Sequence, residues 1–135
     1  MRRDIEFRTP EDAICVLKPN GTEVQYHIFS EYEIHLNKIL PHTEQEWNYH
    51  STIEETIVVT KGRLCCEYLV GSERAKRSMG PGEVVRVKNS IHTFRNDTDE
   101  TAEFIVFRFV PDGRDKRAQI KGDKTVVARD AVLFG

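Results

Sequence analysis

Residues 47–55 read WNYHSTIEE and lead into an apolar segment that ends at Gly62. Residues 80–82 read GPG and lead into a second apolar segment, which ends with HTFRN at residues 92–96. Each stretch therefore sets an imidazole or a carboxylate beside a β-like segment and a glycine turn. Two such stretches favour a small barrel with polar side chains held on its strands.

The histidines and the carboxylate in these stretches indicate a metal site. His50, Glu55 and His92 are the side chains that a barrel of this kind could gather in its interior. Imidazole and carboxylate together suit Zn, Fe, Ni, Cu and Mn, so the ligand set predicts a divalent metal without choosing one.

Short runs rich in Val, Ile, Phe, Tyr and Thr recur along most of the chain, and Gly, Pro, Asn and Asp separate them. Such runs are typical of strands, and no segment is typical of a long helix. Strands are predicted at residues 13–18, 24–30, 33–40, 47–50, 55–61, 64–70, 75–79, 83–88, 92–96 and 102–110. Their spacing of roughly 8–12 residues predicts an all-β sandwich or barrel.

The composition is that of an ordinary globular domain. The chain has 135 residues, of which 39% are hydrophobic and 31% charged, and its formal net charge is −2. One domain with one core is therefore expected, with no electrostatic case for nucleic acid or an anionic membrane as partner. No apolar run approaches the ~20 residues of a membrane span, and no signal peptide is visible. We therefore expect a cytoplasmic protein whose three cysteines are free thiols.

The period of two in a strand sorts the candidate ligands by face. Asn48 and His50 share one face of their predicted strand, and Glu55 shares a face with Ile57 on the next. Glu54 is the competing carboxylate, but it has the opposite parity. A core-facing Glu is costly unless it is paired or bound to a metal, which favours Glu55 as a ligand.

On the later strand His92, Phe94 and Asn96 share a face by the same alternation. The simplest alternative to a metal site is that His50 and His92 are two unrelated polar residues. A lone histidine on an apolar strand is usually a hydrogen-bonded core or rim residue, so spacing alone leaves both interpretations open.

The two stretches resemble the two sequence motifs of the cupin superfamily. The first family motif contains His-x-His, three or four residues, Glu, six residues and Gly, and His50, Glu55 and Gly62 match that spacing. The second motif ends with a His, three residues and an Asn, and His92 and Asn96 match it, with Gly82 as the motif's first glycine. The resemblance covers roughly residues 34–110.

Two departures from the family pattern bear on the metal. Asn48 stands where the first motif has its first histidine, and Lys88, Asn89 and Ser90 stand where the second has Pro-x-Gly. Asn can ligate through its amide oxygen, but it is a poorer ligand than imidazole for late transition metals. Two histidines and one carboxylate can still hold Fe, Mn, Ni or Zn, with Asn48 or water in the fourth position.

The resemblance implies a double-stranded β-helix, or jelly-roll barrel, with a pocket at its mouth. Residues 34–110 would form the barrel and residues 1–33 an N-terminal strand extension. In cupin-like chains such strands often complete a sheet on a partner subunit, so a homodimer is expected with this extension at the contact. Residues 111–135 are expected to form a loop, with a possible edge strand at residues 125–128.

Three functions remain open, because one fold hosts many chemistries. The first is a metal-dependent enzyme of the dioxygenase or isomerase type that acts on a small polar metabolite. The second is a metal-independent isomerase or epimerase of sugar nucleotides. It would use His50 or His92 as base and Tyr49 or Tyr68 as acid, with candidate diphosphate ligands Arg63, Arg86, Arg95 and Arg108. The third is a non-catalytic binding module for a small ligand, with a decayed metal site.

Overall fold

The computed structural model describes residues 4–130, and its regular structure consists mainly of ten strands. They are β1 (Ile14–Leu17), β2 (Glu23–Ile28), β3 (Tyr32–Ile39), β4 (Thr43–Glu44), β5 (Glu54–Lys61), β6 (Leu64–Val70), β7 (Glu73–Met79), β8 (Val84–Arg86), β9 (His92–Asn96) and β10 (Ala102–Phe109). A 3-10 helix, η1 (Pro10–Asp12), precedes β1, and the helix α1 (Arg117–Gly122) follows β10. The predicted segments 1–33 and 111–135 both extend beyond the described residues, at 1–3 and 131–135.

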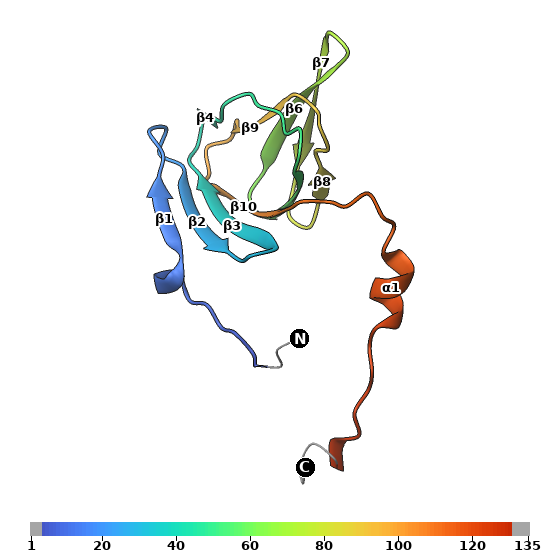
Figure 1. The fold of residues 1–135 in the computed structure, drawn as a ribbon. Coiled ribbons are helices and arrows are strands. Elements are labelled where there is room, and N and C mark those ends of the chain that lie inside the picture. Colours follow the sequence, from blue (N-terminus) through green and yellow to red (C-terminus); the bar gives the residue numbers. More distant parts are fainter. Residues whose placement is uncertain (1–3, 131–135) are drawn as a thin grey trace.

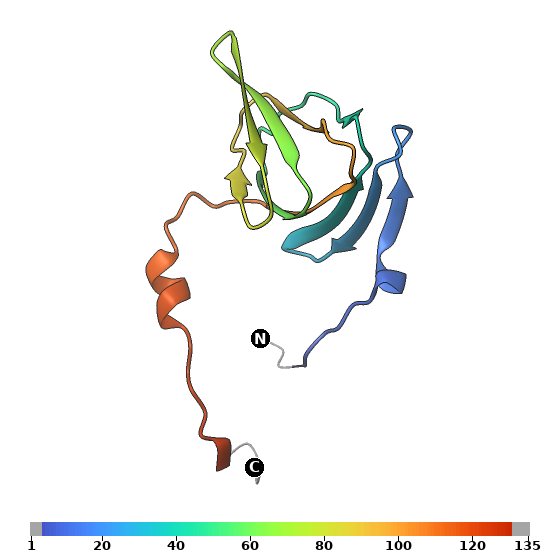
Figure 2. The same ribbon diagram turned by 180° about the vertical axis from the view of Figure 1, so that it is seen from behind.

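The strands form two antiparallel sheets that face each other (Figures 1 and 2). The six-stranded sheet has the order β1-β2-β3-β10-β5-β8, and the four-stranded sheet has the order β4-β9-β6-β7. The prediction of an all-β jelly-roll barrel is confirmed, and β1 and β2 extend the larger sheet beyond β3 as the predicted N-terminal strands. In both views, the segment before β1 and the segment that carries α1 run away from the barrel.

The three central strands of the six-stranded sheet share a register that matters for the site. Arg108 on β10 lies opposite Glu33 on β3 and opposite Glu55 on β5. Two residues along β10, Val106 lies opposite His35 on β3 and Ile57 on β5. Because side chains alternate along each strand, these residues all face the interior of the barrel, where β3, β10 and β5 present matched rows.

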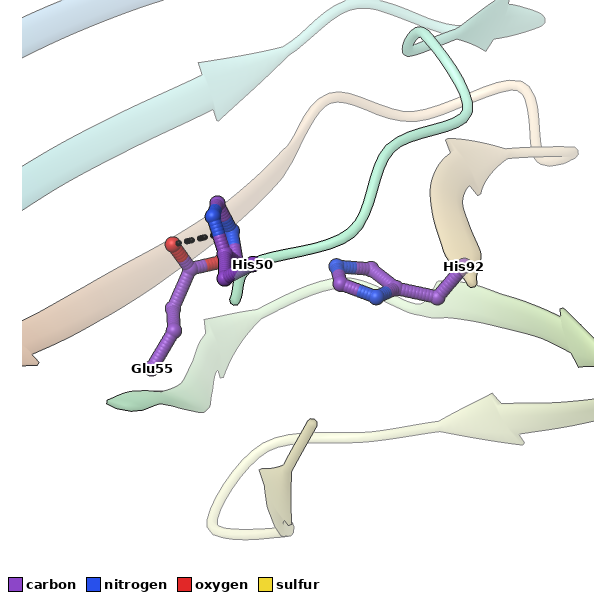
Figure 3. Close-up of side chains that lie close together, drawn as sticks. All are labelled: His50, Glu55 and His92. Atoms are coloured by element: carbon purple, nitrogen blue, oxygen red, sulfur yellow. Dashed lines mark ion pairs between the residues drawn. The ribbon is translucent and has the colours of Figure 1, made fainter. Parts of the chain in front are cut away.

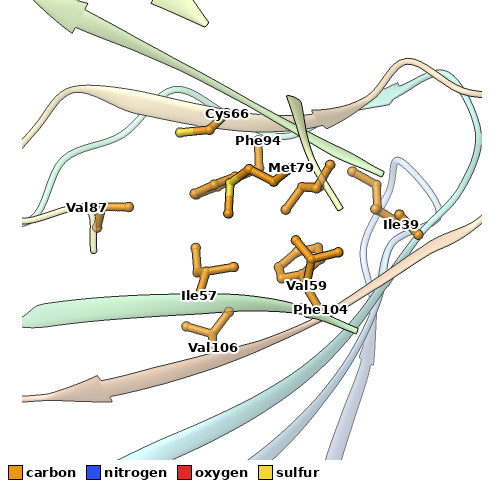
Figure 4. Close-up of a cluster of buried hydrophobic side chains, with 11 residues drawn as sticks. Ile39, Ile57, Val59, Cys66, Met79, Val87, Phe94, Phe104 and Val106 are labelled. Atoms are coloured by element: carbon orange, nitrogen blue, oxygen red, sulfur yellow. The ribbon is translucent and has the colours of Figure 1, made fainter. Parts of the chain in front are cut away.

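The apolar core lies between the two sheets (Figure 4). Both sheets and the turn after β8 contribute buried side chains to it, and these are Ile39, Ile57, Val59, Leu64, Cys66, Met79, Val87, Phe94, Ala102, Phe104 and Val106. The predicted inward parity of Ile57 and Phe94 is confirmed, because both are buried in this cluster. All three cysteines are free, with Cys15 exposed and the other two buried, as expected.

The predicted strand at residues 47–50 is wrong. The chain pairs with β9 at β4, which was not predicted, and then only at the isolated bridge between Asn48 and His92. The backbone N–H of Gln45 donates to the Phe94 carbonyl, whereas the N–H of Asn48 donates to the His92 carbonyl. Between these two bonds, Glu46 and Trp47 lie opposite the single residue Thr93, and such an extra residue interrupts a ladder.

The predictions for the C-terminal segment are also corrected. Residues 125–128 form no strand, and Val126 is 81% exposed, because no strand within residues 4–130 pairs with it. Part of the expected loop is the helix α1, whose Ala118 and Gln119 favour helix formation. The Asp115 carboxylate accepts a hydrogen bond from the Arg117 N–H, which places a negative charge at the helix start.

The motif glycine Gly62 is required by its backbone. Its φ is +73°, and an added Cβ would lie 3.0 Å from the Thr101 carbonyl oxygen and 3.1 Å from the Ala102 Cα. A side chain here would be strained by the left-handed conformation and would clash with a close backbone neighbour.

Within residues 4–130, no helix has the length and apolar character needed to cross a membrane.

Candidate metal centre

Three predicted ligands meet at one end of the barrel interior. Glu55 is the second residue of β5, His92 is the first residue of β9, and His50 lies in the loop that leads into β5. One potential ligand atom from each of the three lies within 4.8 Å of the others. Figure 3 shows the His92 ring pointing from its strand toward the His50–Glu55 pair.

Glu55 is held from two sides. Its Oε2 lies 3.3 Å from His50 Nε2 and accepts hydrogen bonds from Arg108 Nε and Nη2, at 3.1 and 2.8 Å. A buried carboxylate without a partner would be costly, and Arg108 balances its charge. The cross-strand register of β5 and β10 is the reason the two side chains meet.

His92 is fixed in one tautomer by its surroundings. It is 1% exposed, and its Nδ1 lies 2.9 Å from the Ser90 carbonyl oxygen. A carbonyl oxygen only accepts, so Nδ1 carries the hydrogen and Nε2 keeps its lone pair. This arrangement is the usual support of a metal-ligating histidine, whose second nitrogen donates to a backbone carbonyl or carboxylate.

The turn that supplies this carbonyl has its own strain. The Ser90 N–H and Oγ both donate to the Val87 carbonyl, at 3.1 and 2.7 Å. Lys88 has a φ of +53°, a left-handed conformation that a non-glycine residue adopts at a cost of about 1–2 kcal/mol. This turn replaces the family's Pro-x-Gly, and it still places the Ser90 carbonyl where His92 Nδ1 can donate to it.

Asn48 lies at the same cavity but is exposed. Its backbone exchanges both hydrogen bonds with His92, at 2.9 and 3.0 Å, and its side-chain Nδ2 donates to the Glu46 carbonyl at 3.1 Å. The side-chain amide nitrogen is therefore engaged, which leaves the amide oxygen as the atom that could face a metal.

The cavity around these residues has a volume of about 250 Å³. Besides the candidate ligands, it is lined by a second polar group on β2 and β3, made of Tyr26, His35 and Asn37. Sequence reasoning missed this group. The strand alternation that places Ile39 in the core also turns His35 and Asn37 inward, and it was the available signal.

His35 is 3% exposed and its Nε2 lies 2.8 Å from Glu33 Oε1. Burial lowers the pKa of His35, and the hydrogen bond that its Nε2 donates to Glu33 opposes this by raising the pKa. The Tyr26 ring meets the imidazole edge-on, with ring centroids 4.5 Å apart.

The candidates for a metal-free diphosphate site do not gather here. Of the four arginines, Arg108 lines the cavity, whereas Arg63 donates to Ser78 and Arg95 to Glu67. Arg86 pairs with Glu54 and, like Tyr68, lines a separate cavity between β6, β7 and β8. Tyr49 is 65% exposed and does not line the metal cavity.

The residues fit a divalent metal. Two imidazoles and one carboxylate come from separate segments to one point, and one imidazole is fixed in the ligating tautomer. Arg108 bonds one carboxylate oxygen of Glu55, and a carboxylate has a second oxygen that can serve as ligand.

Comparison with known proteins agrees with the motifs. The family model of the cupin domain matches residues 35–108. A cupin 2 conserved barrel domain protein from Salinispora arenicola CNS-205 is 21% identical with a TM-score of 0.59. The match covers 79% of this chain and 90% of the Salinispora protein. A sugar phosphate isomerase from a cupin superfamily, of Silicibacter pomeroyi DSS-3, is 22% identical with a TM-score of 0.59. The match covers 73% of this chain and 70% of the isomerase.

A third similar structure is Drosophila melanogaster CENP-C bound to CAL1, which is 12% identical with a TM-score of 0.65 and covers 73% of this chain and 77% of its own. No match was found among curated proteins. Identities this low show the shared fold alone, whereas the family model spans more than half of the 135 residues. The chain therefore belongs to the cupin domain family.

Proposed function

We propose that this protein binds one divalent metal ion through His50, Glu55 and His92, and that it acts as a metal-dependent enzyme on a small polar metabolite. The observation that carries the proposal is the convergence of these three ligand atoms within 4.8 Å inside a barrel cavity. Asn48 or water would complete the coordination. When bound, the metal would supply a Lewis acid beside an open position for a substrate oxygen.

The size and lining of the cavity support a small polar ligand. Its volume of about 250 Å³ lies below the ~300–1,000 Å³ typical of sites for drug-sized molecules. Lys18, Gln45 and Asn37 line it together with the candidate ligands and offer both donors and acceptors. The sugar phosphate isomerase with this fold supports an isomerase-type reaction as one of the two reaction classes.

The metal proposal is tested by a competition titration against a chromophoric chelator with tag-free protein. We expect one Zn, Mn, Ni or Fe site per chain in wild type, and a loss of affinity of more than about 100-fold for His92→Ala. His42→Ala is the matched control, because His42 pairs with Asp99 away from the cavity. Equal affinities for all three proteins would contradict the proposal and favour a metal-free isomerase or a binding module.

We also propose that two copies associate through the N-terminal strand extension. The support is β1, an edge strand of the larger sheet whose Ile14, Val16 and Leu17 are exposed. An edge strand presents unpaired N–H and C=O groups that a second copy can pair. Sedimentation of wild type as a dimer and of Val16→Lys as a folded monomer would support this, and a wild-type monomer would contradict it.

A further inference from the structure

A second chemical group faces the candidate metal centre from across the cavity. His35 and Glu33 lie on β3, and Tyr26 lies beside His35 on β2. His35 is nearly fully buried, and burying an imidazole costs free energy that an apolar residue at this position would not. His35 is also one of the residues that line the cavity, so its imidazole can contact a molecule bound there.

The hydrogen bond between the two side chains fixes the roles of the imidazole nitrogens. Nε2 of His35 lies 2.8 Å from the Glu33 carboxylate, which accepts, so Nε2 carries the hydrogen. Nδ1 then holds the lone pair of the neutral ring, and within residues 4–130 no hydrogen bond engages it. A neutral imidazole oriented by a carboxylate is the arrangement of a general base.

The register places this pair at a useful distance from the candidate ligands. Arg108 lies between Glu33 on β3 and Glu55 on β5, and Val106 lies between His35 and Ile57. Two strand spacings separate β3 from β5, about 10 Å. A molecule in the cavity can therefore lie between the carboxylate of the metal centre and the imidazole of His35, since both residues line the same space.

We propose that His35 is a catalytic base for proton transfer at a carbon next to a carbonyl group, and that Glu33 is its positioning residue. The inference rests on the proposed function and selects the isomerase type from its two reaction classes. The carbonyl oxygen would lie toward Arg108 and the candidate ligands, and the adjacent carbon toward His35.

The step is balanced without an oxidant or reductant. The C–H bond next to the carbonyl breaks, and the proton passes to His35 Nδ1. The electron pair of that bond forms a carbon–carbon double bond, and the carbonyl π electrons move to the oxygen. Return of a proton from Nδ1 to the same carbon restores the C–H bond and exchanges its hydrogen with solvent. In a hydroxycarbonyl substrate, return of the proton to the former carbonyl carbon, with the hydroxyl proton passing to the enolate oxygen, gives the isomer.

The test measures hydrogen exchange in D₂O by NMR, with dihydroxyacetone, dihydroxyacetone phosphate and glyceraldehyde as probes and the metal-loaded full chain. We expect wild type to accelerate exchange at the carbon beside the carbonyl for at least one probe. His35→Gln should lower the rate by about 100-fold or more, with unchanged metal affinity. His27→Gln is the matched control, because His27 lies on β2 at the opposite parity to Tyr26 and does not line the cavity.

A second readout does not depend on activity. In ¹⁵N NMR spectra of histidine-labelled protein, His35 should show a protonated Nε2 and an unprotonated Nδ1 at neutral pH. Glu33→Gln should disturb this tautomer and lower the exchange rate without changing metal affinity. A protonated Nδ1 in wild type would overturn the proposal.

The outcomes separate the two proposals. Metal binding without exchange of any probe, or with equal exchange in His35→Gln, overturns the role of His35 and leaves the metal centre standing. Exchange that depends on His35 in a protein that binds no metal supports His35 and overturns the metal proposal.

Discussion

The two ends of the barrel interior are built by the same strands and differ in what they bury. At one end, β3, β10 and β5 contribute Ile39, Phe104 and Val59 to a closely packed apolar cluster. At the other end, the same strands contribute Glu33, Arg108 and Glu55. On β10 and β5 the change from apolar to charged falls at one row of the sheet, where Arg108 lies opposite Glu55. On β3 it begins earlier, because Asn37 and His35 lie opposite Phe104 and Val106.

The apolar end of the interior supplies stability, and the polar end supplies the groups that can bind or react. Burial of the apolar end removes hydrocarbon from water at roughly 25 cal/mol per Å² and stabilises the fold. The polar end buries charges and imidazoles that must be paired to be tolerated, and it contributes the donors and bases. Substitutions at the two ends should therefore have separable effects on unfolding and on binding.

The largest effect on unfolding is expected at the apolar end. Ile39→Ala should lower the free energy of unfolding by about 2–5 kcal/mol, because Ile39 is 0% exposed and its truncation leaves a cavity. Leu40→Ala, one residue on and 44% exposed, should cost under about 1 kcal/mol. Chemical denaturation measures both. Similar losses of unfolding free energy for the two variants would contradict the assignment of stability to the apolar end.

At the polar end, His50→Ala should weaken metal binding and leave the free energy of unfolding almost unchanged. It should lower divalent-metal affinity by about 100-fold or more, because it removes one of three strong ligands. Unfolding of the metal-free protein should change by about 1 kcal/mol or less, since the His50 ring is partly exposed and lies in a loop. Metal titration and denaturation of the same preparation test both halves, and a variant that loses stability but keeps its metal would reverse the assignment.

Asn48→His tests whether the residue at position 48, where the family motif has a histidine, can reach the metal. An imidazole in place of the amide should raise affinity for Ni, Zn or Fe by about 10-fold, because nitrogen replaces water or a weak oxygen ligand. The chelator competition measures the change. Unchanged affinity would mean that position 48 does not reach the metal.

The smallest effect concerns pH. Burial lowers the pKa of His35, so its contribution to stability is present above the unfolded value of about 6.5 and is lost as pH falls. The groups that face it are Glu33 on its own strand, Tyr26, Arg108 and Glu55. Metal-free wild type should lose more unfolding free energy than His35→Gln between pH 7 and 5 (about 1.4 kcal/mol per pH unit at most). Parallel pH profiles would contradict this.

The parts of the fold and site that were predicted from sequence are those set by local patterns. The period of two along single strands correctly placed Glu55 with Ile57 and His92 with Phe94 on inward faces. The resemblance to the two cupin motifs predicted that the two segments meet, and ligand atoms of His50, Glu55 and His92 do lie close together.

The parts that were missed depend on pairing between distant segments. Arg108 lies opposite both Glu33 and Glu55 only because β10 lies between β3 and β5, and no local pattern reports that order. The aromatic residues around Asn48 are typical of a strand, but the extra residue opposite β9 limits pairing there to one bridge. Residues 125–128 have strand-forming side chains, but no strand in the described part of the chain lies beside them to pair with.

The most direct test of the metal centre is anomalous diffraction from crystals soaked in Zn or Mn, with data collected at the metal edge. One peak is predicted in the cavity, about 2.0–2.2 Å from ligand atoms of His50, Glu55 and His92. A cavity without a peak at saturating metal, or a peak confined to an outer site such as the His42–Asp99 pair, would contradict the assignment.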